Sequence, residues 1–169
     1  LIVKDEDIKN LTGLTLKNVI LNAKKGKKTI YSDLGELLFT HFGVSGPLAL
    51  SLSSSLDKND IKDLETYIDL KPALSFEQLD ARIQRDFEKY NNKNLINALV
   101  DLMPKALIPV IIKRTGLSEE NKPNELTKAQ RHSIVDALKY FKLDVTALKP
   151  VEEGIITRGG INVKEIDSK

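Results

Sequence analysis

The two histidines, whose side chains titrate near neutral pH, are the first candidates for chemistry in this sequence. His41 precedes a glycine-rich segment between an expected strand and an expected helix, which is the kind of connection where functional loops are often built. An ordinary surface histidine explains His41 as well. His132 lies beside Arg131 on an expected helix, where a solvated position is the simpler interpretation. The sequence has no cysteine for a zinc-thiolate site, and we expect no metal site.

The segment from 41 to 47 has a second possible use. Gly43, Ser45 and Gly46 allow backbone N–H groups to face one point in front of a helix that Pro47 would begin, an arrangement suited to an anion or another electron-rich ligand. An ordinary connection that needs glycine for its backbone dihedral angles explains the same residues. Because Pro47 stands where a G-x-S-x-G nucleophile elbow needs its second glycine, the sequence does not predict a serine hydrolase.

A pair of glycines near the end of the chain is the other candidate site. Gly159 and Gly160 follow Thr157 and Arg158 between β-forming residues, which indicates a bulge or a place where the backbone approaches a ligand closely. Neither a G-x-G-x-x-G nor a Walker A sequence occurs, so we do not expect this chain to build such a dinucleotide site alone. The lysines within 24–28 could contact phosphates, although the solvated tip of a hairpin explains them better.

The composition limits the classes of protein that fit. The 169 residues suffice for one large domain or two small ones, and 41% of them are hydrophobic while 30% are charged. A net charge of +2 is too balanced to indicate nucleic acid or a membrane surface, and 5 Phe and 4 Tyr without Trp leave few platforms for bases. No apolar stretch approaches the roughly 20 residues of a membrane-spanning helix. We therefore expect a cytoplasmic protein that contacts no membrane, and we do not expect it to bind nucleic acid.

The elements that must position these residues begin with strands. Residues 11–40 alternate between apolar and polar side chains, and the three-residue step from Leu16 to Val19 predicts a β-bulge. The polar stretch 24–28 predicts a hairpin connection, and we expect a second connection at 32–35.

From 75 to 141 the apolar spacing becomes helical. Ser75 matches a capping box and begins one helix, and Thr127 begins the last one. A third helix should start at Pro104 and be shortened or kinked by Pro109. The remaining expected elements are helices over 47–56 and 95–103 and strands over 65–71, 143–148 and 155–163.

The order of the elements is β-rich, helical and β-rich again, which predicts an α+β fold. We expect a small β-barrel-like sheet interrupted by an inserted helical bundle that buries its own apolar faces. The barrel-like subdomain would comprise 1–74 and 142–163, the helical subdomain 75–141, and a tail 164–169. Strand-like residues at both ends indicate a piece of a longer protein.

Three segments resemble one known family. Residues 35–47, Gly-Glu-Leu-Leu-Phe-Thr-His-Phe-Gly-Val-Ser-Gly-Pro, closely resemble the G-E-L-L-F-T-H-x-G-x-S-G-P segment of the NAD(P)/FAD-dependent oxidoreductases of the aminoacetone-oxidase and bile-acid-reductase type. Residues 11–19 are similar to that family's L-x-G-x-S-L-K-N-V strand, with Thr15 for the commoner serine. Residues 157–167 are similar to its T-x-G-G-V-x-x-x-E-I-D segment, with Ile161 for valine.

The resemblance implies that this chain is the β-barrel and helical insertion of an FAD-binding domain. The dinucleotide fingerprint would lie before Leu1, and further FAD segments after Lys169. FAD would then be bound by the full-length parent, with none in this fragment. The implied partners are the missing FAD-binding domain of the same polypeptide and a small-molecule substrate. The implied cofactor-side residues are Thr157, Gly159 and Gly160, and the substrate-pocket candidates are His41, Gly43, Ser45 and Gly46.

Functions of different classes remain open at this point. The first is a substrate-pocket or lid domain, without catalysis of its own, from a flavoprotein oxidoreductase that uses or reacts with NAD(P)H. The alternative is a small barrel that binds RNA or another polyanion through the basic patch at 24–28, which would make binding sensitive to salt. An interaction scaffold with an exposed apolar patch on its helices is a third possibility. The sequence does not define the substrate or whether His41 or Ser45 takes part in chemistry.

Overall fold

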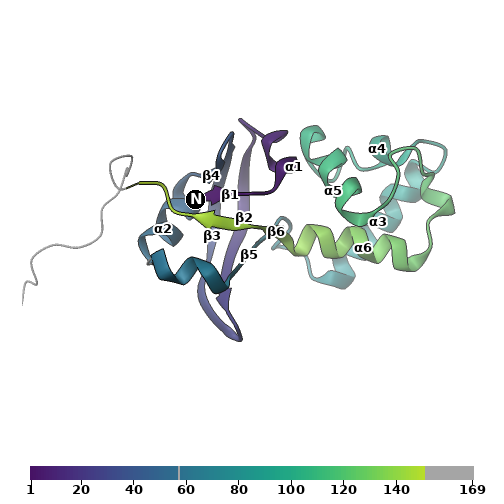
Figure 1. Cartoon of the computed structure of the whole chain (residues 1–169). Helices are drawn as coiled ribbons and strands as arrows, with labels where there is room; N and C mark the ends of the chain where they lie inside the picture. The colour runs from purple at the N-terminus through teal and green to yellow at the C-terminus, as the bar shows by residue number, and fades with distance from the viewer. Residues whose placement is uncertain (57, 151–169) are drawn as a thin grey trace, which may run out of the picture.

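The computed structural model describes residues 1–56 and 58–150. Its strands form one seven-stranded sheet in the order β6-β5-β2-β3-β4-β1-β7, and every pairing is antiparallel. The sheet curls into a nearly closed barrel (Figure 1). The strands are β1 (Ile2–Val3), β2 (Thr15–Lys25), β3 (Lys28–Thr40), β4 (Gly43–Ser45), β5 (Leu64–Asp69), β6 (Phe141–Leu143) and β7 (Val145–Ala147).

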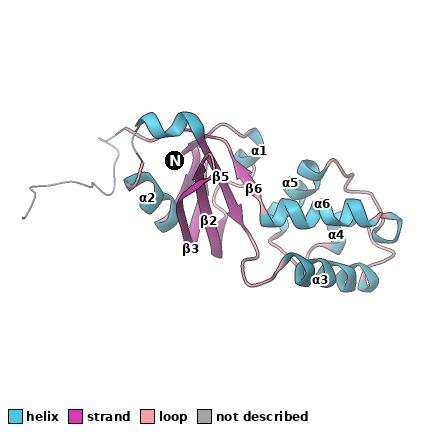
Figure 2. Ribbon diagram, turned by 90° about the horizontal axis from the view of Figure 1, so that it is seen from below, coloured by secondary structure: helices cyan, strands magenta, loops and turns pink. Residues whose placement is uncertain are grey.

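The helices fall into two groups. One group lies with the barrel, and the other gathers beside it, at one end of the molecule (Figures 1 and 2). The barrel helices are α1 (Glu6–Lys9), α2 (Pro47–Ser54) and the 3₁₀ segment η1 (Lys58–Asp63). The second group comprises α3 (Phe76–Lys89), α4 (Leu95–Ala98), η2 (Lys105–Leu107), α5 (Ile108–Thr115), η3 (Pro123–Glu125) and α6 (Lys128–Lys139). Together with the barrel, these helices confirm the α+β fold.

The β2–β3 hairpin is the longest feature of the barrel and confirms two of the predictions. The strands turn at residues 26–27, inside the lysine-rich stretch. The register of the pair shifts between Leu16 and Val19, which is the expected bulge. Asn18 within the bulge has φ of 54°, a left-handed conformation that asparagine tolerates better than most residues. The bulge keeps Leu16 and Val19 both buried inside the barrel.

The expected connection at 32–35 is wrong, because β3 runs through it without a break. Asp33 and Leu34 remain paired with Leu21 and Ile20 of β2. The turn-like composition has a different cause, because this part of the strand faces solvent. Ser32, Asp33 and Leu34 are all exposed, and the exposed fraction of Leu34 is 57%. Polar residues are expected on the solvated face of an antiparallel sheet as well as in a turn.

The single strand expected at 143–148 is also wrong, since two short strands meet there. Asp144 separates β6 from β7, and its N–H donates to Asp5 Oδ2 at 2.8 Å. The two strands pair at opposite ends of the sheet order, which brings those ends together and almost closes the barrel. The strand expected at 155–163 lies outside the described residues.

Local sequence signals explain where the principal helices begin. Ser75 and Gln78 form a reciprocal capping box at the start of α3, and Thr127 and Gln130 form another at α6. Pro109 occupies the first turn of α5, where its missing N–H is tolerated, and the preceding turn is the 3₁₀ segment η2. The helix expected over 95–103 is shorter, because α4 ends at Ala98. In the described part of the chain no helix is long and apolar enough to cross a membrane.

Cation-centred contacts join the second group of helices to the barrel. Arg114 of α5 donates from Nε and Nη2 to the Asp7 carboxylate of α1, at 2.7 and 3.0 Å. Its Nη1 donates to the Lys142 carbonyl at 2.6 Å, and its guanidinium carbon lies 3.9 Å from the centre of the Phe141 ring. Lys139 of α6 pairs with Asp69 of β5 at 2.7 Å. These contacts hold the helices in a defined orientation on the barrel.

Candidate functional site

The substrate-pocket candidates lie in one continuous segment on the barrel. His41 occupies a two-residue turn between β3 and β4, Gly43 and Ser45 begin and end β4, and Gly46 is the N-cap of α2. The expected turn over 41–47 is therefore a turn, a short strand and a helix start. The cofactor-side candidates lie outside the described residues: Thr157, Gly159 and Gly160.

Both glycines of this segment have structural reasons to be glycine. Gly43 has φ of +143°, and a Cβ there would lie 2.5 Å from the Leu1 carbonyl oxygen and 2.6 Å from the Val3 nitrogen. Gly46 has φ of +89°, and a Cβ there would lie 3.2 Å from the Leu38 nitrogen. The neighbouring backbone thus leaves no room for a side chain at Gly43, whereas at Gly46 a side chain is disfavoured by the positive φ and the tight contact with β3.

The backbone donors of this segment are partly used by the sheet. The Val44 N–H donates to the Leu1 carbonyl at 3.1 Å, and the Leu1 nitrogen donates to the Val44 carbonyl at 2.9 Å. Strand pairing therefore occupies the Val44 N–H, one of the backbone donors of this segment.

An exposed edge surrounds His41. The His41 ring meets the Phe42 ring edge-on, with 5.1 Å between ring centres. The Lys149 ammonium lies 4.0 Å from the centre of the Phe42 ring. Val3 N–H donates to the Phe42 carbonyl at 3.0 Å, and Ile2 pairs with Ala147. Residues near both ends of the described chain therefore lie beside this turn, where an imidazole, an aromatic ring and an ammonium group meet.

The Thr40 side chain is a feature that sequence reasoning missed. Its Oγ1 is buried, and among the described residues it has no hydrogen-bond partner. An unsatisfied buried polar group costs on the order of 1–3 kcal/mol. The only signal for it was its place directly before His41 in the family-like segment.

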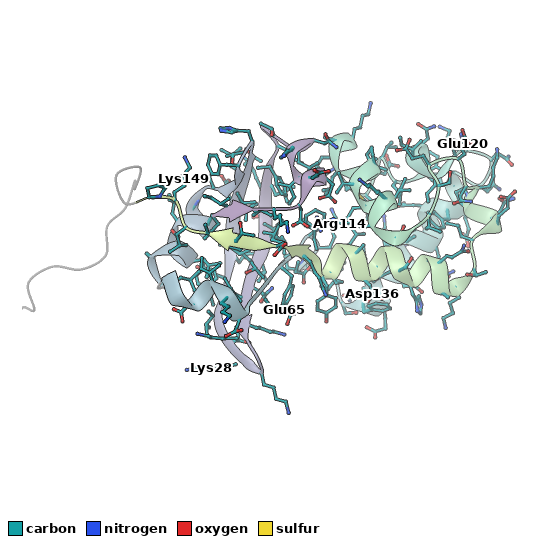
Figure 3. The ribbon with its side chains drawn as sticks, in the orientation of Figure 1. Lys28, Glu65, Arg114, Glu120, Asp136 and Lys149 are labelled. Carbon is teal, nitrogen blue, oxygen red and sulfur yellow. The ribbon has the colours of Figure 1, made fainter. Side chains whose placement is uncertain are left out.

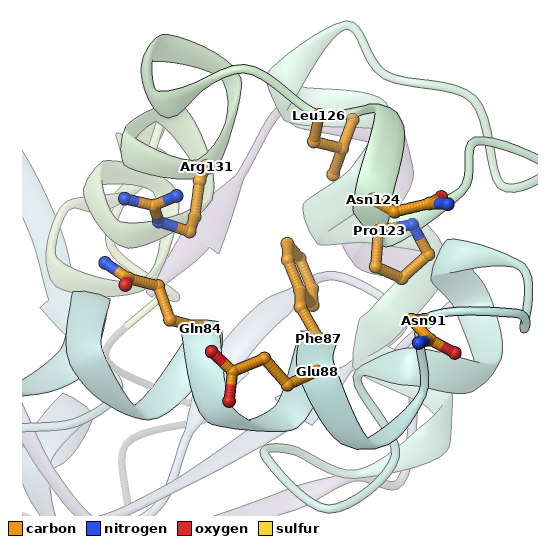
Figure 4. Close-up of a pocket in the computed structure, with 8 residues that line it drawn as sticks. All are labelled: Gln84, Phe87, Glu88, Asn91, Pro123, Asn124, Leu126 and Arg131. Atoms are coloured by element: carbon orange, nitrogen blue, oxygen red, sulfur yellow. The ribbon is translucent and has the colours of Figure 1, made fainter.

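The second group of helices contains a cavity of about 420 Å³ between α3, η3 and α6 (Figure 4). Arg131 on its wall is already paired, since its Nε donates to Asp80 at 2.6 Å. This hydrogen bond keeps the pKa of Asp80 below its ordinary value. The cavity has a mixed lining of Gln84, Phe87, Glu88, Asn91, Pro123, Asn124, Leu126 and Arg131.

His132 lies next to this region and is less solvated than expected. Its Nε2 lies 3.6 Å from Asp80 Oδ2, and its ring meets the Phe76 ring edge-on at 5.1 Å. The structure therefore gives His132 a packing contact between α3 and α6. It does not bring His132 together with His41, which lies on the barrel.

A third region joins the barrel to the helices. A cleft of about 540 Å³ lies between α5, α6 and β6, and Tyr140 and Lys142 are among its lining residues. The Tyr140 ring contacts the Tyr67 ring of β5, with 5.4 Å between centres and 48° between planes. The Lys24 ammonium lies 5.2 Å from the centre of the Tyr67 ring. No motif in the sequence signalled this cluster.

FAD does not fit the described residues by themselves. Dinucleotides bind at the switch points of parallel sheets, where a glycine-rich turn leads from a strand into a helix. All strand pairs among residues 1–56 and 58–150 are antiparallel, so this part of the chain offers no such crossover.

Comparison with known families agrees with the barrel and the helices. The family model described as "HI0933-like protein barrel and H2TH domain" matches residues 1–156. The chain therefore belongs to this family, whose members are related to FAD-dependent oxidoreductases. The resemblance to a flavoprotein family is confirmed.

Individual relatives are similar over most of this chain. It is 27% identical over 165 residues to the ribosomal RNA dihydrouridine synthase of Haemophilus influenzae, covering 98% of the chain and 38% of the relative. It is 23% identical to the enzyme of that name from Escherichia coli, over 97% of the chain and 38% of the relative. It is 22% identical to the 3-dehydro-bile acid delta(4,6)-reductase of Clostridium scindens, over 83% and 35%. The chain thus spans less than two fifths of these relatives.

Proposed function

We propose that this chain is the inserted, substrate-side domain of an FAD-dependent oxidoreductase, and that it has no redox activity of its own. The observation that carries the proposal is the family match over residues 1–156, in a family related to flavoproteins. FAD bound by the longer protein would supply the hydride chemistry. The barrel and helices would hold the substrate and exclude water from it. We also propose that residues 75–141 form the subdomain inserted into the barrel.

The edge around His41 is the part that we propose to face the FAD-binding domain. Lys149 lies on Phe42 at this edge, and the chain continues from there toward Thr157 and the glycine pair. The exposed His41 imidazole can donate or accept a hydrogen bond to a substrate. The buried Thr40 hydroxyl, which lacks a partner in the described part of the chain, would gain one from the adjoining domain. Ser45, Gly43 and Gly46 would shape the same pocket wall.

The test of this proposal is the visible absorption spectrum of two purified proteins, each prepared without added cofactor. One is this 169-residue chain, and the other is the full-length protein that we propose contains it. We expect flavin absorption from the full-length protein and none from this chain. A full-length protein that is colourless and takes up no added FAD would overturn the proposal. If this chain binds FAD by itself, the proposal that the rest of the longer protein binds the cofactor would be overturned.

RNA is a second candidate for what the domain binds, and one observation favours it. Two of the relatives are named as synthases acting on ribosomal RNA, and each aligns with nearly the whole chain. The balanced charge that argued against nucleic acid does not exclude a local binding surface.

A further inference from the structure

We propose that the outer face of the barrel at β5 and β6 binds single-stranded RNA, with bases stacked on Tyr67 and Tyr140 and phosphates held by Lys24 and Lys142. This inference rests on the second proposed function, RNA as the bound substrate, and it assigns that function to particular side chains. It differs from a basic patch at the hairpin tip, because aromatic rings provide the principal contact.

The strand register places the central ring on the outside of the barrel. Tyr67 pairs with Asn22 of β2 on one side and with Lys142 of β6 on the other. Residues opposite one another in antiparallel strands point to the same face of the sheet. Thr66 and Ile68, on either side of Tyr67 in β5, are buried. Tyr67 and Lys142 therefore share the outer face.

The two tyrosines form a tilted pair that leaves aromatic surface open. Tyr140 ends α6 and is 54% exposed, and it is one of two large apolar side chains, with Leu34, that stand out as exposed in the described part of the chain. Its ring is tilted by 48° from that of Tyr67, with 5.4 Å between centres. Exposed aromatic rings of this kind are the platforms on which unpaired bases stack.

Cations flank the rings on both sides. Lys24 comes from β2 and Lys142 from β6, the two strands that neighbour β5. The Lys24 ammonium lies 5.2 Å from the Tyr67 ring centre, and the Lys142 side chain is exposed. Arg114 fixes the backbone of β6 by donating to the Lys142 carbonyl. Phosphates on either side of a stacked base would therefore meet a lysine.

Carboxylates around the two tyrosine rings repel RNA phosphates and so reduce the electrostatic contribution to RNA binding. Glu65 pairs with Lys24 across the strands, and Asp136 lines the adjoining cleft with Tyr140. Asp69 is already paired with Lys139. Figure 3 shows Glu65 and Asp136 close to this region, while Lys28 extends from the hairpin tip away from it. An Asp136 carboxylate suits the amino or imino groups of a base, which donate hydrogen bonds. Stacking therefore contributes more than charge.

The experiment measures binding of this 169-residue chain to a fluorescently labelled single-stranded RNA of about 12 nucleotides, by anisotropy at several salt concentrations. We expect Tyr140→Ala to weaken binding on the order of tenfold, and Tyr140→Phe to stay within about twofold of the original protein, because the ring is what stacks. Leu34→Ala is the matched control, since that side chain is as exposed as Tyr140 and lies on β3. It should leave binding unchanged.

Charge variants separate this surface from the hairpin tip. Lys142→Gln should reduce the slope of log affinity against log salt by about 0.7, the value for one phosphate contact on a single strand. Glu65→Gln should strengthen binding, because it removes a carboxylate beside Lys24. The double variant Lys27→Gln, Lys28→Gln should bind as the original protein does.

Three results would overturn the inference: no RNA binding by a folded chain, equal affinity of Tyr140→Ala and the original protein, or loss of binding in the hairpin-tip variant alone. Circular dichroism of each variant must match the original, so that lost binding is not lost folding. The flavin spectrum of the full-length protein is independent of this assay. A yellow full-length protein whose inserted domain does not bind RNA would leave the flavoprotein proposal standing and remove only the RNA surface.

Discussion

Replacing Arg114 with alanine tests whether the helices and the barrel depend on one ionic contact. The guanidinium makes two hydrogen bonds to Asp7 and one to the Lys142 carbonyl, and it lies over the Phe141 ring. The side chains of the pair are only 19% and 13% exposed. Removing one partner of a buried ion pair lowers the free energy of unfolding by about 3–5 kcal/mol, because the remaining charge is buried without a partner of opposite charge. Allowing for the remaining exposure, we expect a loss of about 3 kcal/mol in the free energy of unfolding.

The pH dependence of this loss distinguishes the ionic contact from simple packing. Burial raises the pKa of Asp7, but the hydrogen bonds and charge of Arg114 outweigh it, so the pKa lies below the usual 3.8. A carboxyl with a depressed folded-state pKa stabilises the protein above its unfolded pKa and loses that stabilisation as the pH falls through the folded value. In Arg114→Ala the hydrogen bonds and charge of Arg114 are lost, while burial, the charge of Lys113 and the backbone hydrogen bond from Ile8 remain. The pKa of Asp7 therefore rises, and its protonation no longer breaks an ion pair with Arg114. The difference between the two proteins should be largest at neutral pH and should shrink in acid.

The assay is urea unfolding followed by circular dichroism at pH 7 and at pH 3.5. Arg85→Ala is the matched control, because Arg85 is exposed on α3, and surface substitutions usually change stability by less than about 0.5 kcal/mol. Adding Asp7→Asn to Arg114→Ala should restore part of the loss, since the half-buried Asp7 carboxylate is then no longer present without its partner; Asp5, 4.0 Å from Arg114 Nη2, still loses its ion pair. A change in Arg114→Ala no larger than that of the control, or an equal loss at both pH values, would refute the reasoning.

Three further predictions concern stability. Gly43→Ala should lower the melting temperature severely or prevent soluble expression, because the new Cβ would lie 2.5 Å from the Leu1 carbonyl oxygen; an alanine variant with normal melting would contradict the geometry. Thr127→Ala removes the N-cap of α6 and should cost about 1 kcal/mol in urea unfolding, whereas Thr127→Ser should cost far less. Lys139→Met leaves the Asp69 carboxylate unpaired and should cost about 3 kcal/mol, and adding Asp69→Asn should recover part of it. Independence of the two substitutions would show that the pair is not coupled.

The sequence alone determined the features that depend on neighbouring residues. The capping residues Ser75 and Thr127 located the starts of α3 and α6, because an N-cap is satisfied within its own first turn. The step from Leu16 to Val19 located the bulge. Side chains alternate between the two faces of a strand, so an extra residue interrupts the apolar–polar alternation in the sequence. The family-like segment 35–47 located the candidate site, although it did not explain its glycines.

Only the tertiary structure decided which distant residues meet. Gly43 must be glycine because β1, which lies far away in the sequence, passes against it. Asp144 divides one expected strand into two because each half finds a partner at a different end of the sheet. Arg114 reaches Asp7 across 107 positions, and Tyr140 reaches Tyr67 where α6 meets β5. Such contacts leave no periodic trace in the sequence, since they depend on how the chain closes its barrel and where the helices are then placed.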